Sequence, residues 1–388
     1  MRNLSRFDKG LKKDNKSLII TVLLVTNYRL DFQYSMLRFA NHLLTHANSE
    51  RIKYSEISPK PVLNRIPSYH TLNKWTGYID KYILFPRLLN KRLKNIPFDC
   101  MHIVDHSNTV YIPKIKYCPT LLTCHDLIAV QAAQQKLPDV PKTSGLGKRL
   151  QNWISKSLTR ADYFACDSSS TEKILHGLIP TAKDRSEVIH LGVRPREHIV
   201  NINHDMHLNP KNTDFLLHVG SSAWYKNRKR LLKAFVDVKE GGKFNNLKLV
   251  LVGPVPQPEE LTEKTERWLN DNPKELIVLS DLSESGLQTL YEHANALIFP
   301  SLIEGFGWPP LEARSLGCAV IASRTGAIDD ILGSSATYVD PMSTKDIVAK
   351  IKVVLNADWT NGPPPHIPKA KECAQAYENL YQRLVESK

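Results

Sequence analysis

The sequence predicts an α/β protein made of two domains, each a parallel β-sheet covered by helices. Short runs rich in β-branched residues alternate with longer segments of helical spacing along most of the chain, which is typical of parallel strands joined by crossover helices. The chain has 388 residues, enough for two such units. A polar stretch without periodicity, residues 194–212, separates them. We therefore place the domain boundary there.

The first predicted domain covers residues 18–195 and follows a basic tail, residues 1–17. An apolar run at residues 18–25 is far shorter than the roughly 20 residues that a membrane-spanning helix needs, so we predict a buried first strand. No small-residue cleavage site follows it, which argues against a signal peptide. A helix is expected at 35–45, and further strands at 100–104, 120–124 and 163–166.

The second predicted domain covers residues 212–360. Its expected strands are 215–219, 248–252, 277–279, 296–299 and 319–322, and its expected helices are 228–239, 261–270, 286–294 and 310–316. Ser285 and Gln288 are spaced as a capping box for the third of these helices. Three prolines at 363–365 interrupt the chain before a C-terminal helical segment, residues 366–388, for which packing back on the first domain is one expectation.

Charge and cysteine usage narrow the class of partner. The 52 Lys and Arg residues outnumber the 39 Asp and Glu residues, giving a formal net charge of +13. This balance favours an anionic partner: nucleic acid, lipid headgroups or a phosphorylated substrate. The six cysteines form no CxxC pair, so neither a zinc site nor a disulfide framework is predicted, and they are interpreted as buried thiols of a reducing compartment.

Several common enzyme motifs are absent from the sequence. It contains no GxGxxG after a strand, no GxxxxGK[ST], no HExxH and no GxSxG, which argues against the usual dinucleotide, P-loop, zincin and hydrolase sites. No two aspartates are separated by one residue, so the paired oxygens that would hold a hard divalent cation are missing, and we expect no metal. His42 and His46 would share a helix face, but an ordinary packed pair is the stronger interpretation.

The segment 299–317 combines a strand, a loop with Glu304, Gly305 and Gly307, and a helix predicted to start at Pro310. Backbone N–H groups at that helix end could hold a diphosphate, while Glu304 and Glu312, the latter expected in the first turn, could accept hydrogen bonds from sugar hydroxyls. The same residues would also suit a purely structural loop with an acidic residue favoured by the helix dipole, and the segment alone does not choose.

The segment 216–235 forms a second candidate element, with a strand, a turn and a helix that Asn227 is expected to cap. Lys226, Arg228, Lys229 and Arg230 gather at the start of this helix, where positive charge opposes the helix dipole. A bound phosphate would resolve the conflict. A solvated basic face is the alternative, because screened surface charges are tolerated.

His125 follows the predicted strand 120–124, at the edge where parallel sheets bind ligands. It could therefore reach a cleft between the domains. A structural histidine is the competing interpretation.

Together these segments resemble the retaining glycosyltransferases of family 4, which have the GT-B fold of two Rossmann-like domains facing each other across a cleft. The residues that carry the resemblance are FPSLIEGFGWPPLEARSLG, with Glu304 and Glu312 as the E-x7-E motif, and HVGSSAWYKN upstream. The resemblance implies that Glu304 contacts the donor sugar, Glu312 the ribose, Lys226 the diphosphate and His125 the reaction centre. It further implies donor contacts from Gly305, Phe306 and Gly307, and base contacts from Ser280, Asp281 and Leu282.

The sequence departs from this family at two places. Family members often have an arginine after the glycine that ends the strand, where this chain has Ser221; Arg228 or Arg230 could supply the second positive charge. The glycine-rich loop common after the first strand is replaced by residues 26–32, where Arg29 is only a candidate for acceptor contact.

The resemblance implies a cytoplasmic enzyme that moves a hexose from a nucleotide-diphosphate sugar to a glycan or lipid-linked acceptor, without metal or cofactor, as in cell-surface polysaccharide synthesis. The basic charge would suit peripheral association with the inner membrane surface. The alternatives are a sugar-nucleotide epimerase or phosphorylase on the same fold and, from another class, a basic nucleic-acid-binding protein. The last has no motif that reads bases, so no nucleic-acid partner is expected.

Overall fold

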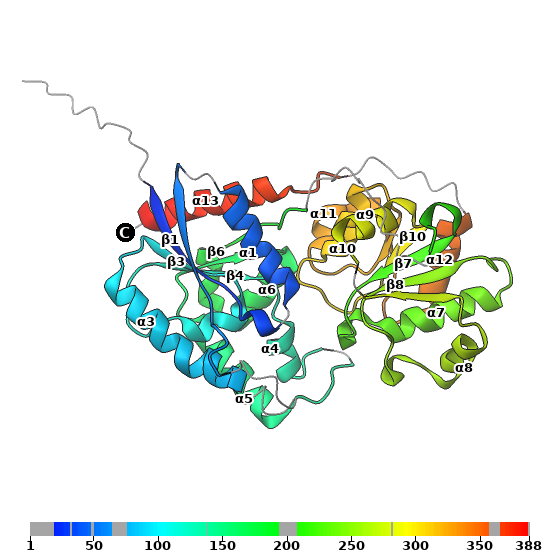
Figure 1. Cartoon of the computed structure of the whole chain (residues 1–388), viewed down its shortest axis with the longest axis horizontal. Coiled ribbons are helices and arrows are strands. Elements are labelled where there is room, and N and C mark those ends of the chain that lie inside the picture. The colour runs from blue at the N-terminus through cyan, green and yellow to red at the C-terminus, as the bar shows by residue number, and fades with distance from the viewer. Residues whose placement is uncertain are drawn as a thin grey trace, which may run out of the picture.

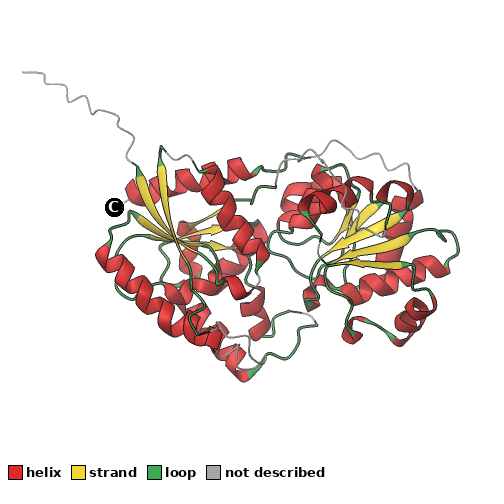
Figure 2. Cartoon of the chain, viewed as in Figure 1, coloured by secondary structure: helices red, strands yellow, loops and turns green. Residues whose placement is uncertain are grey.

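Two α/β units make up the protein, in a computed structural model that describes residues 19–31, 33–47, 50–63, 76–137, 139–193, 208–280, 282–356 and 365–386. Each unit is built on a six-stranded sheet whose paired strands are all parallel. Figure 1 shows the two sheets in separate halves of the molecule, and Figure 2 shows helices around each of them. The predicted α/β class with two Rossmann-like domains is confirmed.

The N-terminal sheet has the order β2-β1-β3-β4-β5-β6. Its central strands are almost wholly apolar and buried, because helices cover both faces of a parallel sheet. The strands are β1 (Ile20–Val25), β2 (Ile52–Ile57), β3 (Cys100–Ile103), β4 (Thr120–Cys124), β5 (Tyr163–Cys166) and β6 (Ser186–Val188). The helices are α1 (Tyr34–His46), α3 (Phe85–Asn95), α4 (Ile128–Ala133), α5 (Gly145–Leu158) and α6 (Ser169–Leu178), with the π-helical turn η2 (Asp80–Leu84) and the 3₁₀ turn η3 (His106–Tyr111).

The C-terminal sheet has the order β12-β11-β10-β7-β8-β9. Its strands are β7 (Phe215–Val219), β8 (Lys248–Val252), β9 (Leu276–Leu279), β10 (Ala296–Phe299), β11 (Val320–Ala322) and β12 (Thr337–Tyr338). Its helices are α7 (Arg228–Glu240), α8 (Glu263–Asp271), α9 (Glu284–His293), α10 (Trp308–Ser315), α11 (Ala327–Leu332) and α12 (Thr344–Asn356), with the 3₁₀ turn η6 (Trp224–Lys226). The side chains on the inner faces of β7, β8 and β10 are buried, and they form the core of this unit.

The order of the strands shows where each sheet is expected to bind a ligand. In the N-terminal sheet the chain runs outward from β1 to β2 and then returns to β3 on the other side of β1. The C-terminal sheet reverses in the same way between β7 and β10. Ligands of open α/β sheets bind beyond the carboxyl ends of the strands at such reversal points. The loops after β1, β3, β7 and β10 are therefore the positions at which to look for a site.

The last helix, α13 (Ala370–Glu386), returns to the N-terminal domain and packs on α1 and β3 (Figure 1). Buried hydrogen bonds fix it there: Tyr381 OH bonds His102 Nδ1 at 2.7 Å, and Tyr377 OH bonds Thr123 Oγ1 at 2.8 Å. Val193 pairs with Lys369 beside Gly192, where a Cβ would overlap the backbone of Lys369. The chain thus crosses twice between the domains.

Several local expectations need correction. The cap of α9 is Ser283, whose Oγ accepts from Gly286 N at 3.1 Å, and not Ser285. Helix α10 begins at Trp308, before Pro310, so Glu312 lies beyond its first turn. Asn227 precedes α7 in a left-handed conformation, but its side chain makes no capping bond; it donates instead to the carbonyls of Pro300 and Pro341.

The basic tail, residues 1–17, and most of the predicted boundary lie outside the described residues. Among the helices that the structure describes, none combines the length and apolarity required to cross a bilayer.

Candidate active site

The loops after β7 and β10 meet at the reversal point of the C-terminal sheet. Leu302 N donates to the carbonyl of Tyr225 at 2.7 Å, which joins the two loops. Lys226 Nζ lies 2.7 Å from Glu304 Oε1 and 4.8 Å from the centre of the Phe299 ring. Glu304 is almost fully buried. A fixed ammonium and a fixed carboxylate therefore stand side by side at the edge where ligands of this fold bind.

The start of α10 supplies backbone donors next to this pair. Gly307 precedes the helix with φ +87°, a conformation that glycine adopts at no steric cost, and prolines occupy the two positions after Trp308. Among the described residues no acceptor contacts the N–H of Phe306 or Gly307. These amides, the positive end of α10 and Lys226 together form an arrangement that can stabilise a diphosphate.

Gly305 brings the two domains into direct contact at this point. A Cβ at position 305 would overlap the carbonyl oxygen of His125. A second contact between the domains lies nearby, where the backbone N and Oγ of Ser169 donate to the Asp330 carboxylate at 2.7 and 2.6 Å. The loop that carries Glu304 therefore lies against the carboxyl end of β4.

Two of the basic residues at the start of α7, Arg228 and Arg230, are paired with carboxylates within the chain. Arg228 Nε lies 3.0 Å from Glu260 Oε1 and its guanidinium donates to the carbonyl of Pro254 at 2.9 Å. Burial lowers the pKa of Arg228. Arg230 bonds Asp139 of the N-terminal domain at 2.9 Å. Carboxylates thus balance Arg228 and Arg230 within the chain, and binding of a phosphate at the start of α7 stays a prediction.

Ser221 and the loop predicted to bind the base make few contacts with the residues described above. Ser221 is exposed, and within the described ranges its hydroxyl accepts a single long hydrogen bond, from Ala223 N at 3.4 Å. Ser280 and Leu282 follow β9, the edge strand two positions from β7. Asp281 lies outside the described residues.

Glu312 contacts the opposite domain. Its Oε1 lies 2.5 Å from the Arg38 guanidinium of α1, and its Oε2 accepts from Tyr291 OH at 3.2 Å. The Arg38 guanidinium also lies 3.9 Å from the centre of the Trp308 ring. Both glutamates of the E-x7-E motif are thus ion-paired inside the protein. Arg38 was not found from the sequence, because nothing in the chain signals which α1 residue meets α10.

His125 is buried between two acceptors. Its Nε2 donates to the carbonyl of Val104 at 2.9 Å, and its Nδ1 lies 3.3 Å from Asp167 Oδ2. Burial lowers the pKa of His125, but the carboxylates of Asp167, Asp105 and Asp126 together outweigh it and the pKa is raised. Burial raises the pKa of Asp167 to about 6. His125 and Asp167 thus form a buried acid–base pair, and it is the backbone of His125 that meets Gly305.

A polar cluster that sequence reasoning missed lies at the reversal point of the N-terminal sheet, after β1 and β3. Asn27 Nδ2 donates to Asp105 Oδ2 at 2.7 Å, and Asn108 donates to Asn27 Oδ1 at 3.0 Å. His106 Nδ1 lies 3.1 Å from Asp105 Oδ1. Burial alone would raise the pKa of Asp105, but His106, His125 and Ser107 together outweigh it and the pKa is lowered. His125 was selected because it follows the carboxyl end of a parallel strand. The same criterion would have selected these residues if the order of the strands had been known.

Arg29 lies apart from this cluster. It lines a pocket of about 590 Å³ together with Glu56, Lys60 and Arg92, beyond the end of β2. Among the described residues no group of three or more His, Cys, Asp and Glu side chains could hold a metal ion.

Comparisons with known proteins agree across most of the chain. Residues 200–378 match the family model described as glycosyl transferases group 1, and residues 34–197 match the model for glycosyltransferase family 4. An O-antigen chain mannosyltransferase of Salmonella typhimurium is 39% identical over 74 residues, which cover 19% of this chain and 21% of that protein. A serotype-specific mannosyltransferase of Escherichia coli is 26% identical over 271 residues, covering 66% of this chain and 32% of that protein.

The first curated relatives are thus matched over between about a fifth and a half of their own length. Among solved structures, the sucrose-phosphate synthase of Thermosynechococcus elongatus superimposes with a TM-score of 0.64 at 14% identity, over 95% of this chain and 97% of that one. This similarity concerns the fold, and it extends over both domains.

Proposed function

Because the chain belongs to the glycosyltransferases of group 1 and family 4, we propose that it moves a hexose from a nucleotide-diphosphate sugar to a hydroxyl of a glycan or lipid-linked acceptor, with retention of configuration and without a metal ion. The names of the relatives favour mannose as the hexose and O-antigen-like polysaccharide as the product. The observation that carries the proposal is the Lys226–Glu304 pair beside the Phe306 and Gly307 amides, which no acceptor among the described residues contacts.

Departure of a nucleoside diphosphate leaves negative charge on the phosphate oxygens and develops positive charge at the anomeric carbon. Lys226 and the amides of Phe306 and Gly307 are fixed donors that can stabilise the leaving charge without rearranging. A departing phosphate oxygen then takes the proton of the acceptor hydroxyl on the same face of the sugar, which retains the configuration. Glu304 positions the sugar and is not a covalent nucleophile in this scheme.

The two domains have different roles in the proposal. Ser280, Leu282 and Glu312 would hold the nucleoside on the C-terminal domain, while His125, held by Asp167, would lie near the transferred sugar. The polar cluster of Asn27, Asp105, His106 and Asn108 faces the same edge of the N-terminal sheet. Its amides and carboxylate are suited to the hydroxyls of an acceptor sugar.

The decisive experiment compares Glu304→Gln and Lys226→Ala with the wild type in a transfer assay with UDP-, GDP- and ADP-hexoses. Loss of one such electrostatic donor is expected to reduce the rate by about 10² to 10³. Lys229→Ala is the matched control, because Lys229 is an exposed cation three residues from Lys226. Full activity in both folded variants would refute these roles.

A sugar-nucleotide epimerase or phosphorylase on the same fold is the second candidate. An epimerase would release free nucleotide in the absence of acceptor, whereas the transferase should release it only in proportion to glycosylated product. Proton NMR of the product's anomeric signal tests retention directly.

A further inference from the structure

A pocket of about 510 Å³ lies beside the proposed active site, where the C-terminal domain meets the connection between α4 and α5. Its wall includes Trp224 and Leu302, which lie two residues before Lys226 and Glu304 respectively. Asp139, in the connection between α4 and α5, contributes from the N-terminal domain. A volume of this size is typical of a ligand-binding pocket. We call this cavity the Trp224 pocket.

The charges that line the Trp224 pocket are balanced. Ion pairs engage five of its lining residues: Arg228 with Glu260, Arg230 with Asp139, and Lys233 with Asp237 outside the pocket. In the part of the chain that the structure describes, the lining charges outside these pairs are Lys229 and Glu259, which are of opposite sign. The pocket therefore has no excess of unpaired charge with which to select an anion such as a phosphate or a nucleotide.

Trp224 gives the pocket an aromatic surface. Its side chain is half-buried, and its indole N–H donates to no acceptor among the described residues. The C–H groups of a hexose pack on the face of an aromatic ring, while its hydroxyls exchange hydrogen bonds with carboxylates and amides. Gln257 and Glu259, both exposed residues that follow β8, supply such groups at the same pocket. A neutral sugar matches this combination better than an ion or an apolar molecule does.

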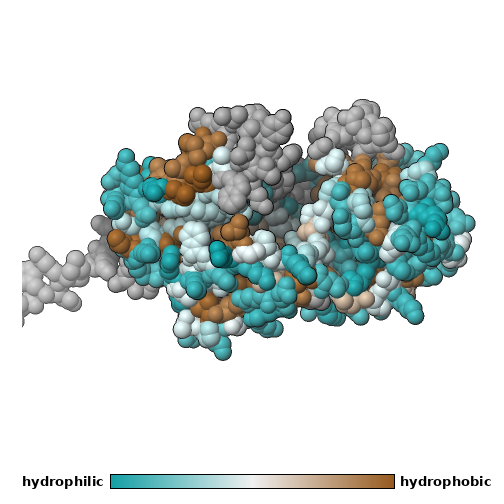
Figure 3. Space-filling model, turned by 90° about the horizontal axis from the view of Figure 1, so that it is seen from below, coloured by the Kyte–Doolittle hydropathy of each residue, from teal (hydrophilic) through white to brown (hydrophobic). Residues whose placement is uncertain are grey.

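The surface on this side of the molecule is also polar. Figure 3 views the side on which the connection between α4 and α5 lies in Figure 1. Hydrophilic residues cover most of this face, and the brown apolar patches on it are separate from one another. Such a surface suits a hydrated glycan chain that leaves the pocket.

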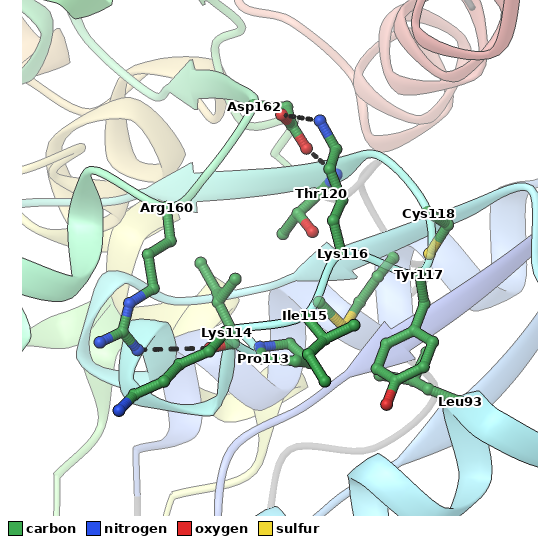
Figure 4. A pocket seen from close by; sticks show the side chains of 12 residues that line it. Leu93, Pro113, Lys114, Ile115, Lys116, Tyr117, Cys118, Thr120, Arg160 and Asp162 are labelled. Carbon is green, nitrogen blue, oxygen red and sulfur yellow. Dashed lines mark hydrogen bonds and ion pairs between the residues drawn. The ribbon is translucent and has the colours of Figure 1, made fainter.

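A second pocket, at the amino end of β4, has different chemistry (Figure 4). It has a volume of about 320 Å³, and Lys116 is paired there with Asp162 at 2.6 Å. The lining charges outside this pair, Lys114 and Arg160, are both positive. The pocket contains one aromatic residue among those labelled, Tyr117, and it lies at the end of the strand opposite to the proposed active site. It therefore provides a matched control for the Trp224 pocket.

We propose that the Trp224 pocket is a second saccharide site, which holds a neutral sugar unit of the acceptor glycan away from the hydroxyl that reacts. The sugar ring would lie on Trp224, and its hydroxyls would bond the Glu259 carboxylate and the Gln257 amide. This inference rests on the proposed function, because it assigns the acceptor to neutral oligosaccharides longer than one sugar. A site so near Lys226 and Glu304 would keep a growing chain attached between transfers.

Isothermal titration with a linear mannose tetrasaccharide, without donor, tests the site itself, since mannose is the hexose of the proposed function. The wild type should bind the tetrasaccharide more tightly than methyl mannoside. Trp224→Ala should weaken binding of the tetrasaccharide by about tenfold, whereas Trp224→Phe, which keeps an aromatic ring, should retain most of it. Glu259→Gln should weaken binding to a smaller extent. Tyr117→Ala, at the pocket of Figure 4, is the matched control and should bind like the wild type.

Transfer kinetics distinguish a saccharide site from a merely structural role of Trp224. The wild type should prefer the tetrasaccharide to methyl mannoside as acceptor, and Trp224→Ala should lose this preference. The loss should appear in KM for the tetrasaccharide more than in kcat. Trp224→Phe should restore the preference, and circular dichroism should show the same fold in all variants.

Absence of wild-type binding to the tetrasaccharide, or equal binding by the wild type and Trp224→Ala, would overturn this inference, and neither result bears on transfer to a single sugar. Displacement of the bound tetrasaccharide by a nucleotide-diphosphate hexose would also overturn it, because the pocket would then be part of the donor site. If the tetrasaccharide binds through Trp224 but no donor supports transfer by the wild type, the proposed function fails and the saccharide site stands.

Discussion

Removing Arg38 should strengthen donor binding. In the structure the Arg38 guanidinium lies 2.5 Å from Glu312 Oε1, and Glu312 is the residue proposed to hold the ribose. A nucleotide sugar must therefore displace Arg38 before its hydroxyls can reach this carboxylate. The substitution Arg38→Met keeps a long side chain against the Trp308 ring while it removes the competing charge.

The size of the effect follows from the surroundings of the ion pair. Both side chains are largely but not fully buried, at 21% and 15% exposure, so the pair is stronger than a surface ion pair and weaker than one cut off from water. A hydrogen bond to a charged group in such a place contributes about 1 to 2 kcal/mol. Because each 1.4 kcal/mol corresponds to a factor of ten, the dissociation constant for the donor should fall about 5- to 30-fold.

Isothermal titration with a nucleotide-diphosphate hexose measures this directly. Glu312→Gln should weaken binding, which tests that the Glu312 carboxylate is the group for which Arg38 and the donor compete. Arg383→Met is the matched control, because Arg383 of α13 is ion-paired with Glu187 of β6 and belongs to no proposed donor contact. Weaker or unchanged binding by Arg38→Met would refute the reasoning, since Arg38 would then contact the donor or have no influence on it.

Other predictions follow from the same geometry. Gly305→Ala should reduce transfer more than tenfold without unfolding either domain, because its Cβ would overlap the His125 carbonyl; Gly177→Ala, with open space around it, is the control, and equal rates in the two variants would contradict the close contact. The variant Asp167→Asn tests the buried pair of His125 and Asp167, with stability measured by urea unfolding. Folding raises the pKa of His125, and it raises the pKa of Asp167 to about 6. The folded wild type therefore binds more protons than the unfolded chain from about pH 4 upward. The stability of the wild type relative to this variant should therefore decrease as pH rises from about 4 to 7, by no more than about 1.4 kcal/mol per pH unit for each proton; an increase would exclude the pairing. EDTA should leave transfer unchanged, because Lys226 and backbone amides are proposed to stabilise the leaving diphosphate, and restoration of a lost rate by Mg²⁺ or Mn²⁺ would contradict this.

The central strands could be predicted from the sequence because they are buried on both faces and so form continuous apolar runs. The predictions for 120–124, 163–166, 215–219, 248–252 and 296–299 agree with the structure. The edge strands β2, β6 and β12 were missed because each is partly exposed to solvent, so their sequences contain polar residues. Strand β12 is also only two residues long.

The motif residues of the C-terminal domain could be selected from the sequence because strand, loop and helix follow each other closely in the chain. The contacts between these residues could not be predicted from the sequence. Lys226 meets Glu304 because β7 and β10 are neighbours in the sheet, and strand order is not readable from one sequence. The ion pair of Arg228 with Glu260, which balances the charge of Arg228, likewise depends on tertiary structure that one sequence does not reveal.

The cluster of Asn27, Asp105 and Asn108 was missed for a related reason. These residues lie in two loops between which the chain forms the strands β2 and β3 and several helices, and the reversal between β1 and β3 brings them together. Their short polar side chains match no motif. What the sequence lacked here was an indication of which strands are adjacent.

The most direct test of the account is a crystal structure of the protein with a nucleotide-diphosphate hexose. We predict that the diphosphate lies within hydrogen-bonding distance of Lys226 Nζ and of the Phe306 and Gly307 amides, with Glu304 released from Lys226 and turned to the sugar. A donor bound elsewhere, or a diphosphate that contacts none of these groups while the Lys226–Glu304 pair stays closed, would contradict it.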